Sequence, residues 1–292
     1  MKVAIYGIKF NDDAFPYIEQ LFKLLIKNNS QIYINHDLHE FIGDRISLSP
    51  EISIYHTPCK IDKELDFLIS IGGDGTILDT ITTVRESNVP IIGINTGRLG
   101  FLANNPKMEV ESAIYNLKNG NFKIDKRTLL KLDSSQNQFG IDNFALNEFT
   151  VHKKASSTMM TIHVSVNGEF LNSYWADGLI IATPTGSTAY SLSCGGPVLS
   201  PGSDNFVITP IAPHNLNLRP LVVRDDVKIN VKIDGREKEF LTTLDSRSAT
   251  IDKEIEMEIT KADFNINLIQ FHDQNFFSTI RNKLMWGLDA RN

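Results

Sequence analysis

The chain has 292 residues, of which 41% are hydrophobic and 22% are charged, an ordinary globular composition with length enough for two domains. Its 29 Lys and Arg against 35 Asp and Glu give a formal net charge of −6, which argues against nucleic acid or an anionic membrane as a partner. No stretch reaches the roughly 18 apolar residues of a spanning helix. The two distant cysteines, Cys59 and Cys194, are typical of a reducing cytosol, so a soluble cytoplasmic protein is expected.

The first part of the chain alternates apolar runs with segments of helical periodicity. Four runs are expected as strands and two helical patterns as helices, one after the first strand and one after the fourth. Two of the runs are continuously apolar, as buried strands of a parallel sheet are. This rhythm predicts an N-terminal Rossmann-like parallel α/β domain over residues 1–125. The apolar runs are residues 3–8, 31–34, 67–71 and 90–94, and the helical patterns fall at residues 15–25 and 110–117.

The second half of the chain changes to the alternation of half-buried strands. Residues 162–166 alternate between apolar and polar side chains and lead into Asn167-Gly168, a strong hairpin signal. Later segments alternate in the same way, so a C-terminal, mainly antiparallel two-layer β domain is expected over residues 126–274. A final helical segment, residues 275–292, is expected to pack back onto the first domain.

The stretch Gly72-Gly73-Asp74-Gly75-Thr76 places one carboxylate on a glycine turn directly after an apolar strand. The glycines remove Cβ atoms that would block a ligand, and the helix expected next attracts anions with its free amides. The stretch is neither a dinucleotide G-x-G-x-x-G nor a P-loop, which would require a lysine. The alternative is a tight turn with Asp74 as an N-cap, and these residues alone leave the two interpretations about even.

A second glycine-rich turn, residues 95–100, follows the next apolar strand and contains Asn95 and Arg98. Both turns should therefore lie at the carboxyl ends of parallel strands, where open α/β sheets bind ligands. The alternative is that both are ordinary turns and that Arg98 is merely solvated. This alternative is less attractive for two such turns together than it would be for either turn by itself.

Two polar segments of the second half suit a nucleotide. Asn147-Glu148 pairs an amide with a carboxylate, which suits a polar ligand such as a ribose diol, although such a dipeptide is more often a solvated loop or strand end, by about 5:1. The stretch from Asp177 to Tyr190 is rich in hydroxyls, with an aromatic ring at its end, and suits a sugar phosphate and a base. Its alternative is Thr and Ser capping of a helix from Ala189.

Taken together, these segments resemble the motif series of bacterial NAD kinases, the ATP-NAD kinase family. The order and combination of the motifs are specific, and the resemblance extends from about residue 67 to residue 287. It implies phosphorylation by ATP of the 2′-hydroxyl on the adenosine ribose of NAD, which gives NADP. The motifs are residues 72–76, 95–102, 147–148, 177–190, 193–197, 213–214 and 219–220.

The resemblance also implies roles for single residues. Asp74 is expected to contact the 2′-hydroxyl and act as the catalytic base, while Asn147 and Glu148 bind NAD through its ribose and Asp177 helps hold the nicotinamide side. The implied NAD-binding set is Gly73, Asp74, Gly75, Asn147, Glu148, Asp177, Thr188, Ala189, Tyr190 and Ser193. The residues that are candidates to bind ATP phosphate, or to lie next to the site, are Gly72, Thr76, Asn95, Arg98, His214 and Arg247.

ATP and NAD are thus the expected substrates, with Mg²⁺ or another divalent metal bridging ATP oxygens through ligands that the sequence leaves unknown. The resemblance further implies a homotetramer. One segment departs from the family, because Asp245-Ser246-Arg247 has an arginine where a neutral glutamine is usual. Arg247 could assist a phosphate, alter oligomer contacts or face solvent.

Two other functions compete with this interpretation. Lipid kinases and phosphofructokinases also place a Gly-Gly-Asp-Gly turn beside a nucleotide, but residues 147–148 and 183–190 favour a dinucleotide acceptor. A non-catalytic NAD- or NADP-binding sensor is the second alternative, and the presence of Asp74 argues against it. The sequence leaves open whether the donor is ATP alone or also inorganic polyphosphate, and whether NADH is accepted.

Overall fold

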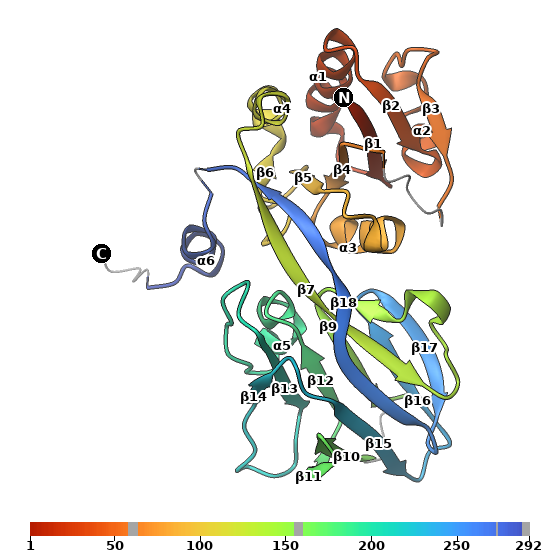
Figure 1. Cartoon of the computed structure of the whole chain (residues 1–292), viewed down its shortest axis with the longest axis vertical. Helices are drawn as coiled ribbons and strands as arrows, with labels where there is room; N and C mark the ends of the chain where they lie inside the picture. Colours follow the sequence, from red (N-terminus) through yellow and green to blue (C-terminus); the bar gives the residue numbers. More distant parts are fainter. Residues whose placement is uncertain (58–63, 155–159, 273, 288–292) are drawn as a thin grey trace. The chain divides into compact units, whose positions relative to one another are not determined.

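The computed structural model describes residues 1–57, 64–154, 160–272 and 274–287. The chain divides into two compact units, one made of Met1–Lys126 with Ile266–Asn292 and the other of Arg127–Asn265 (Figure 1). Each unit has its own cluster of buried apolar side chains. The family-like motifs around Asp74 fall in the first unit, and those around Glu148 fall in the second.

A parallel sheet with the strand order β3-β2-β1-β4-β5 forms the centre of the first unit. The central strands β1, β4 and β5 are buried almost throughout, which explains their continuous apolar sequence. The strands are β1 (Lys2–Gly7), β2 (Gln31–Asn35), β3 (Ser53–Tyr55), β4 (Phe67–Gly72), β5 (Ile91–Asn95) and the short β6 (Asn105–Pro106), which pairs with β5.

Three helices of the first unit, α1, α2 and α4, pack buried apolar side chains into the same core. In α1, Ile18, Leu21, Phe22 and Leu25 are buried at helical spacing, as the sequence predicted. The helices are α1 (Phe15–Lys27), α2 (His36–Ile42), α3 (Asp74–Val84), α4 (Val110–Asn119) and α6 (Phe276–Leu284), with 3-10 turns at Asp12–Ala14, Gly43–Arg45, Arg85–Ser87 and Lys107–Glu109.

The second unit consists of two antiparallel layers. One layer has the strand order β14-β13-β12-β9-β16-β17, the other contains β11-β10-β15-β18, and the facing apolar side chains of both form one core. Turn Asn167-Gly168 joins β10 to β11 with φ of 52° and 81°, the left-handed pair of a tight hairpin. The predicted fold class, a parallel α/β domain followed by a mainly antiparallel two-layer β domain, is confirmed.

The chain connects the two units through β7 and β18. Strand β18 pairs with β15 near its start and with β5 at Leu268. The strands are β7 (Lys123–Ser134), β8 (Phe144–Ala145), β9 (Glu148–Lys153), β10 (Met160–Val166), β11 (Glu169–Ala176), β12 (Gly178–Ala182), β13 (Asn205–Ile211), β14 (Leu221–Arg224), β15 (Ile229–Gly235), β16 (Glu239–Leu244), β17 (Arg247–Asp252) and β18 (Glu256–Gln270); α5 is Tyr190–Ser193, and 3-10 turns lie at Gly140–Asp142 and Gly186–Thr188.

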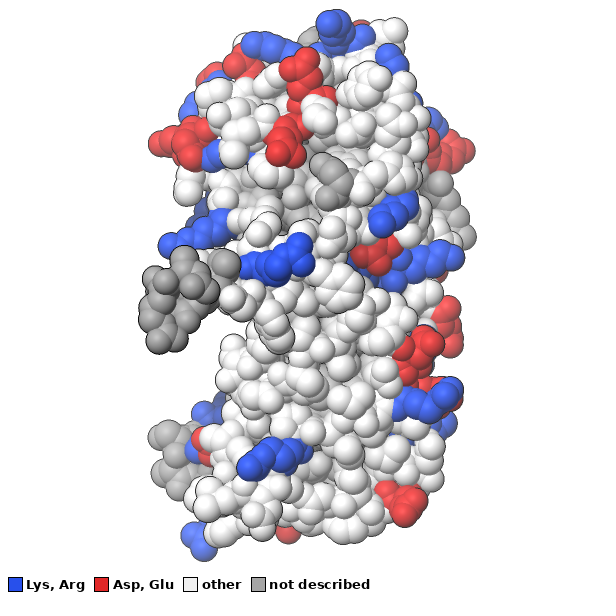
Figure 2. Space-filling model, turned by 90° about the vertical axis from the view of Figure 1, so that its left-hand side faces the viewer, with Lys and Arg blue, Asp and Glu red and all other residues white. Residues whose placement is uncertain are grey.

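The surface carries charges of both signs. In Figure 2, Lys and Arg side chains are interspersed with Asp and Glu over the upper part of the face drawn, which belongs to the first unit. No helix in the described part of the chain combines the length and apolarity needed to cross a bilayer.

Candidate functional site

Asp74 is the first residue of α3, and its side chain reaches to the second glycine-rich turn. Asp74 Oδ2 accepts the backbone N–H of Phe101 at 2.8 Å, and Oδ1 accepts those of Leu102 at 3.0 Å and Ala103 at 2.8 Å. The N-cap of α3 is Gly73, and no side chain caps the helix. The alternative of Asp74 as an N-cap is therefore wrong, because its carboxylate binds another segment.

The Asp74 carboxylate keeps some capacity for a ligand. A carboxylate offers about four lone-pair sites, of which the three backbone N–H groups occupy all but about one, on Oδ2. Its side chain is 30% exposed. A ligand hydroxyl can therefore donate to Oδ2 while the other contacts hold the carboxylate in place.

The glycines around Asp74 have different functions. Gly100 allows the approach of the carboxylate, because a Cβ there would lie 1.8 Å from Asp74 Oδ1. Gly72 has φ of +155°, and its Cβ would lie 2.1 Å from Oγ1 of Thr76. Around a Cβ at Gly73 or Gly75 there would be no heavy atom within 4 Å. The backbone at Gly73 and Gly75 is thus exposed, with free space around it.

The Asn95 side chain fixes the conformation of the second glycine-rich turn, residues 95–100. Its side-chain Nδ2 donates to the carbonyls of Arg98 and Ala103, both at 2.9 Å, and its Oδ1 accepts the N–H of Gly97 at 2.8 Å. Asn95 is 3% exposed, whereas the Arg98 side chain is exposed. Asn95 therefore positions the loop whose amides bind Asp74, and Arg98 is open to solvent beside it.

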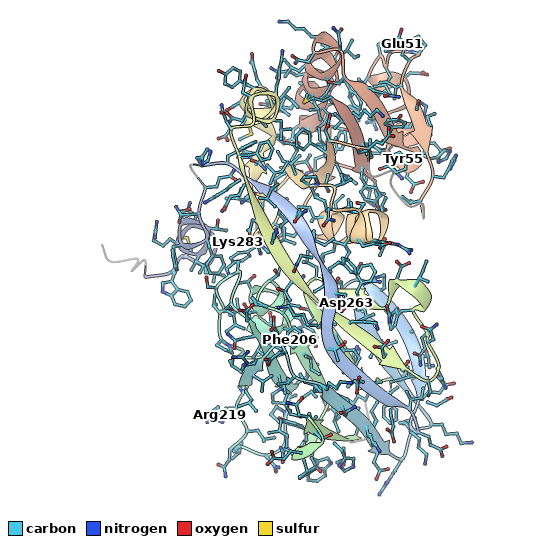
Figure 3. The ribbon with its side chains drawn as sticks, in the orientation of Figure 1. Glu51, Tyr55, Phe206, Arg219, Asp263 and Lys283 are labelled. Atoms are coloured by element: carbon cyan, nitrogen blue, oxygen red, sulfur yellow. The ribbon has the colours of Figure 1, made fainter. Side chains whose placement is uncertain are left out.

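Lys283, which sequence motifs did not single out, lies close to the same carboxylate. It comes from α6, near the end of the chain (Figure 3). Its Nζ donates to the carbonyl of Leu99 at 2.8 Å and lies 4.0 Å from Asp74 Oδ2. The expected helix of the last segment is present, and through Lys283 it contacts the loop of the first unit that holds Asp74.

In the second unit, Asn147 and Glu148 lie at the start of β9, where each is 8% exposed. The carboxylate of Asp245 accepts three consecutive backbone N–H groups, from Leu146 at 2.9 Å, Asn147 at 2.7 Å and Glu148 at 3.2 Å. The alternative of a solvated dipeptide is wrong, because the backbone of the pair is held by a fully buried carboxylate.

Glu148 has an unusual electrostatic environment. Burial, and secondly the charge of Asp245, raise the pKa of its carboxyl to about 8, although the N–H of Tyr190 acts in the opposite direction. Its Oε2 is buried and has no hydrogen-bond partner among the described residues. Burial also raises the pKa of Asp245, but three N–H donors and Arg247 favour the charged form of that carboxyl. We infer that Glu148 carries the proton of the pair at neutral pH.

Arg247 binds the backbone of the segment that precedes Asn147. Its guanidinium donates to the carbonyls of Asp142 and Phe144, lies 5.5 Å from the Phe144 ring centroid and is 3.9 Å from Asp245 Oδ2. The side chain is 24% exposed. Of the three alternatives, a solvent-facing arginine is wrong, because the guanidinium is bound to the chain itself.

The hydroxyl-rich segment separates into a buried and an accessible set. Thr183 is buried, donates to the Leu146 carbonyl at 2.5 Å and accepts the N–H of Gly186 at 3.2 Å. A Cβ at Gly186 would lie 2.1 Å from the Asn147 carbonyl oxygen, so this turn packs directly on the Asn147 backbone. No side chain caps α5. The predicted residues of the segment are the accessible set, with Thr188 and Ala189 partly exposed and Tyr190 and Ser193 exposed.

The other predicted residues of the second unit have partners of their own. Asp177 Oδ1 forms an ion pair with Lys153 Nζ at 2.6 Å. His214 is exposed, and its ring lies 4.9 Å from that of Trp175, whose carbonyl accepts the His214 N–H at 2.9 Å.

The side chains of the described residues do not form a metal-binding site of their own. They contain no group of three or more His, Cys, Asp or Glu side chains placed to hold a metal ion. Cys194 is a free thiol, and Cys59 lies outside the described residues.

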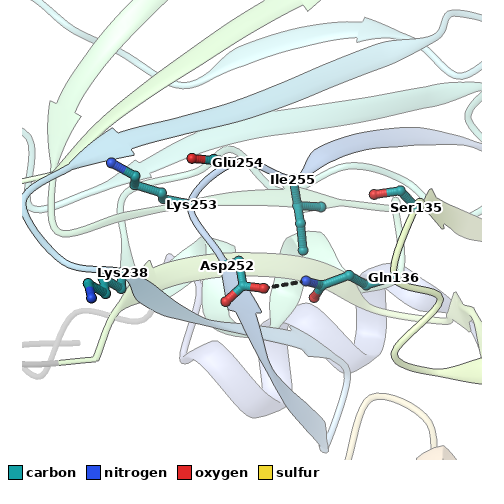
Figure 4. Close-up of a pocket in the computed structure, with 7 residues that line it drawn as sticks. All are labelled: Ser135, Gln136, Lys238, Asp252, Lys253, Glu254 and Ile255. Atoms are coloured by element: carbon teal, nitrogen blue, oxygen red, sulfur yellow. Dashed lines mark hydrogen bonds between the residues drawn. The ribbon is translucent and has the colours of Figure 1, made fainter.

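A polar hollow of about 490 Å³ lies elsewhere on the second unit (Figure 4). Across it, Gln136 donates to Asp252 at 2.5 Å. None of its lining residues belongs to the predicted site. They are Ser135, Gln136, Lys238, Asp252, Lys253, Glu254 and Ile255.

Comparison with known proteins matches two family models, the ATP-NAD kinase N-terminal domain over residues 7–122 and the ATP-NAD kinase C-terminal domain over residues 146–271. The NAD kinases of Cytophaga hutchinsonii and Flavobacterium psychrophilum are each 46% identical to this chain, with full coverage of both sequences. The NAD kinase of Bacteroides fragilis is 40% identical, again over the whole of both.

Solved structures show the same fold. Yeast NADH kinase complexed with NADH superposes with a TM-score of 0.86 at 23% identity and covers all of this chain and 89% of its own. An NAD kinase from Archaeoglobus fulgidus in complex with ATP gives a TM-score of 0.72 at 25% identity, with 98% and 99% covered.

Proposed function

The chain belongs to the ATP-NAD kinase family, and on that basis we propose that it transfers the γ-phosphoryl group of ATP to the 2′-hydroxyl on the adenosine ribose of NAD. The observation that carries the proposal is the Asp74 carboxylate, held by three consecutive backbone N–H groups with about one lone pair left for a hydroxyl.

In the proposed reaction, Asp74 orients the 2′-hydroxyl and receives its proton. The bond between the 2′-oxygen and the γ-phosphorus forms, the bond from that phosphorus to the β–γ bridging oxygen breaks, and ADP leaves with the electron pair. Phosphoryl transfer through a loose transition state depends chiefly on alignment, so the acid can accept the proton late and need not be a strong base. The fixed position of Asp74 supports this role.

Asn147 and Glu148 are proposed to bind NAD through its ribose. Asp245 supports this role by holding the backbone of both residues, so that their side chains have a defined direction. A protonated Glu148 can donate a hydrogen bond to a ribose oxygen, which an ionised carboxylate cannot do. The remaining proposed NAD contacts are Gly73, Gly75, Asp177, Thr188, Ala189, Tyr190 and Ser193.

On the donor side, the open backbone at Gly73 and Gly75 supports a phosphate beside α3. We propose Gly72, Thr76, Asn95 and Arg98 as residues that shape or border this position, with His214 and Arg247 as neighbours of the NAD contacts. Mg²⁺ or another divalent metal is proposed to accompany ATP and to neutralise part of its phosphate charge.

Further parts of the proposal concern the whole chain. We propose that its domains are residues 1–125 with 275–292 and residues 126–274, that it acts as a homotetramer and that it is cytoplasmic. The presence of two compact units supports the two-domain division. Sedimentation of the purified protein would test the tetramer.

The decisive experiment is an assay of purified protein with NAD, ATP and Mg²⁺, in which an NADP-specific dehydrogenase detects the product. We expect ATP-dependent NADP formation, and no phosphorylation of diacylglycerol or fructose phosphate offered in place of NAD. Lipid or sugar phosphorylation without NADP would overturn the proposal. Tight NAD binding without any product would favour the sensor.

A further inference from the structure

The C-terminal helix α6 places the ammonium group of Lys283 beside the glycine-rich turns of the first unit. The helix begins after Asn275, whose side chain accepts the N–H of Ser278 at 2.9 Å, and it ends one residue after Lys283. The Lys283 ammonium donates to the carbonyl of Leu99 at 2.8 Å. Leu99 lies in the loop whose next amides bind Asp74, so one loop positions both the carboxylate and the ammonium.

Lys283 and Asp74 do not form a close ion pair. Their charged atoms are 4.0 Å apart, and their side chains are 33% and 30% exposed. Leu99 uses one of the three donors of the ammonium, and the Phe101 ring lies 5.3 Å away. The geometry therefore leaves donor capacity for an anion that approaches from solvent beside Asp74.

The proposed reaction requires a positive charge beside Asp74, where the phosphoryl group of ATP would approach. A phosphoryl group brought to Asp74 meets a carboxylate whose own hydrogen bonds come from neutral amides, so the two negative charges repel each other. P-loop proteins use a lysine within the glycine loop, and this glycine turn has none. Lys283 supplies such a charge, because its ammonium lies 4.0 Å from Asp74 Oδ2.

We propose that the Lys283 ammonium binds the terminal phosphate of the donor beside Asp74. This inference rests on the proposed function and deepens it, because it assigns to the last helix the charge that a P-loop lysine supplies elsewhere. Lys283 holds the γ-phosphate during its transfer, while Asp74 takes the hydroxyl proton.

A purely structural role for Lys283 is the competing explanation. Helix α6 buries none of its residues, so the bond to Leu99 could serve only to attach the helix. The two roles differ in their ligand dependence. A phosphate-binding lysine discriminates ATP from ADP, whereas a lysine that only attaches a helix affects both nucleotides alike.

The test compares Lys283→Met, Lys283→Arg and the matched control Arg281→Met, which removes an exposed charge from the same helix. In calorimetric titrations without NAD, Lys283→Met should weaken ATP binding about tenfold more than ADP binding. In the assay it should lower kcat/KM for ATP by about 10- to 100-fold and leave the KM for NAD within about twofold.

Lys283→Arg should recover part of the ATP preference, because it retains the charge, and Arg281→Met should match the parent protein. Equal weakening of ATP and ADP, or unchanged ATP binding in Lys283→Met, would overturn the inference. Absence of NADP formation by the parent protein would instead refute the proposed function. The ATP-over-ADP comparison needs no NAD and still tests Lys283 in that case.

Discussion

The backbone N–H of Glu148 donates to Asp245 Oδ1 at 3.2 Å. The buried Asp245 carboxylate therefore lies close to Glu148, which has a buried carboxyl group of its own. Burial is the larger cause, and the Asp245 charge the second, of a pKa near 8 for Glu148. An acid that is protonated at neutral pH is a hydrogen-bond donor. We therefore expect NAD binding to depend on pH near 8 and folding stability to depend on pH between about 4.5 and 8.

We expect the affinity for NAD to fall as pH rises through about 8, because ionised Glu148 can no longer donate a hydrogen bond to a ribose oxygen. Glu148→Gln keeps a donor at every pH, so its affinity should change little over the same range. Calorimetric titrations with NAD between about pH 6.5 and 9.5 measure both proteins. Glu239→Gln, which alters a surface ion pair, is the control. An affinity of the parent protein that is constant or rises above pH 8 would contradict this role.

The same carboxyl should make folding stability depend on pH. Its pKa is raised from 4.5 in the unfolded chain to about 8 in the folded one, so between these values the folded chain holds a proton that the unfolded chain has lost. The contribution of Glu148 is thus fully present below about pH 4.5 and is lost as pH rises through 8. Relative to the parent, Glu148→Gln should gain on the order of 3 kcal/mol between pH 5 and 8, since one pKa unit corresponds to about 1.4 kcal/mol. Urea unfolding at both pH values would show no such gain if the Glu148 pKa were normal.

Arg247→Gln removes the guanidinium from two backbone carbonyls. We expect a loss of about 1–3 kcal/mol of unfolding free energy, because the Asp142 and Phe144 carbonyls lose charged donors. Arg224→Gln is the matched control. Its side chain is 76% exposed and pairs with Asp226 at the surface, so the loss should be clearly smaller than for Arg247→Gln. Equal losses in urea unfolding would mean that Arg247 contributes no more than a surface ion pair.

The sequence predicted the fold well where burial leaves a periodic signal. Strands β4 and β5 are buried on both faces and are continuously apolar, while β10 and β15 alternate because one face is buried. The length of β18 was not predicted. Its 15 residues include polar and charged side chains, so alternation is visible only in its first part.

The candidate site was predicted less completely than the fold. The turn around Asp74 has a glycine signature, but its partners are backbone amides at residues 101–103, which any amino acid except proline can supply. The same holds for the amides that bind Asp245. Lys283 is one lysine on a solvent-accessible helix, and only the tertiary structure of the first unit brings it near Asp74. Side-chain motifs are visible in a sequence, whereas hydrogen bonds from distant backbone are not.

Gly100→Ala should impair the reaction through Asp74 alone. The added Cβ would lie 1.8 Å from Asp74 Oδ1, so the carboxylate must leave its position against the amides. We expect kcat to fall about 100-fold, because alignment is the main contribution to phosphoryl transfer. Gly97→Ala is the control, since a Cβ there has no heavy atom within 4 Å. Matching kcat values in the two variants would exclude a requirement for the Gly100 contact.

Asp74→Asn should keep NAD binding and lose most NADP formation. An amide cannot accept the hydroxyl proton, so we expect kcat to fall by about 10²- to 10⁴-fold while the dissociation constant of NAD stays within about threefold. The variant also loses an acceptor for one of the N–H groups at residues 101–103, which should lower the melting temperature slightly.

Asp79→Asn, on the same helix, is the control for the loss of charge in Asp74→Asn. The coupled assay gives kcat, calorimetry gives NAD affinity, and thermal melts identify any variant that is unfolded at the assay temperature. Near-normal turnover of folded Asp74→Asn would exclude Asp74 as the central acid. Because Gly100→Ala displaces the same carboxylate without changing its chemistry, the two variants together separate the position of Asp74 from its acidity.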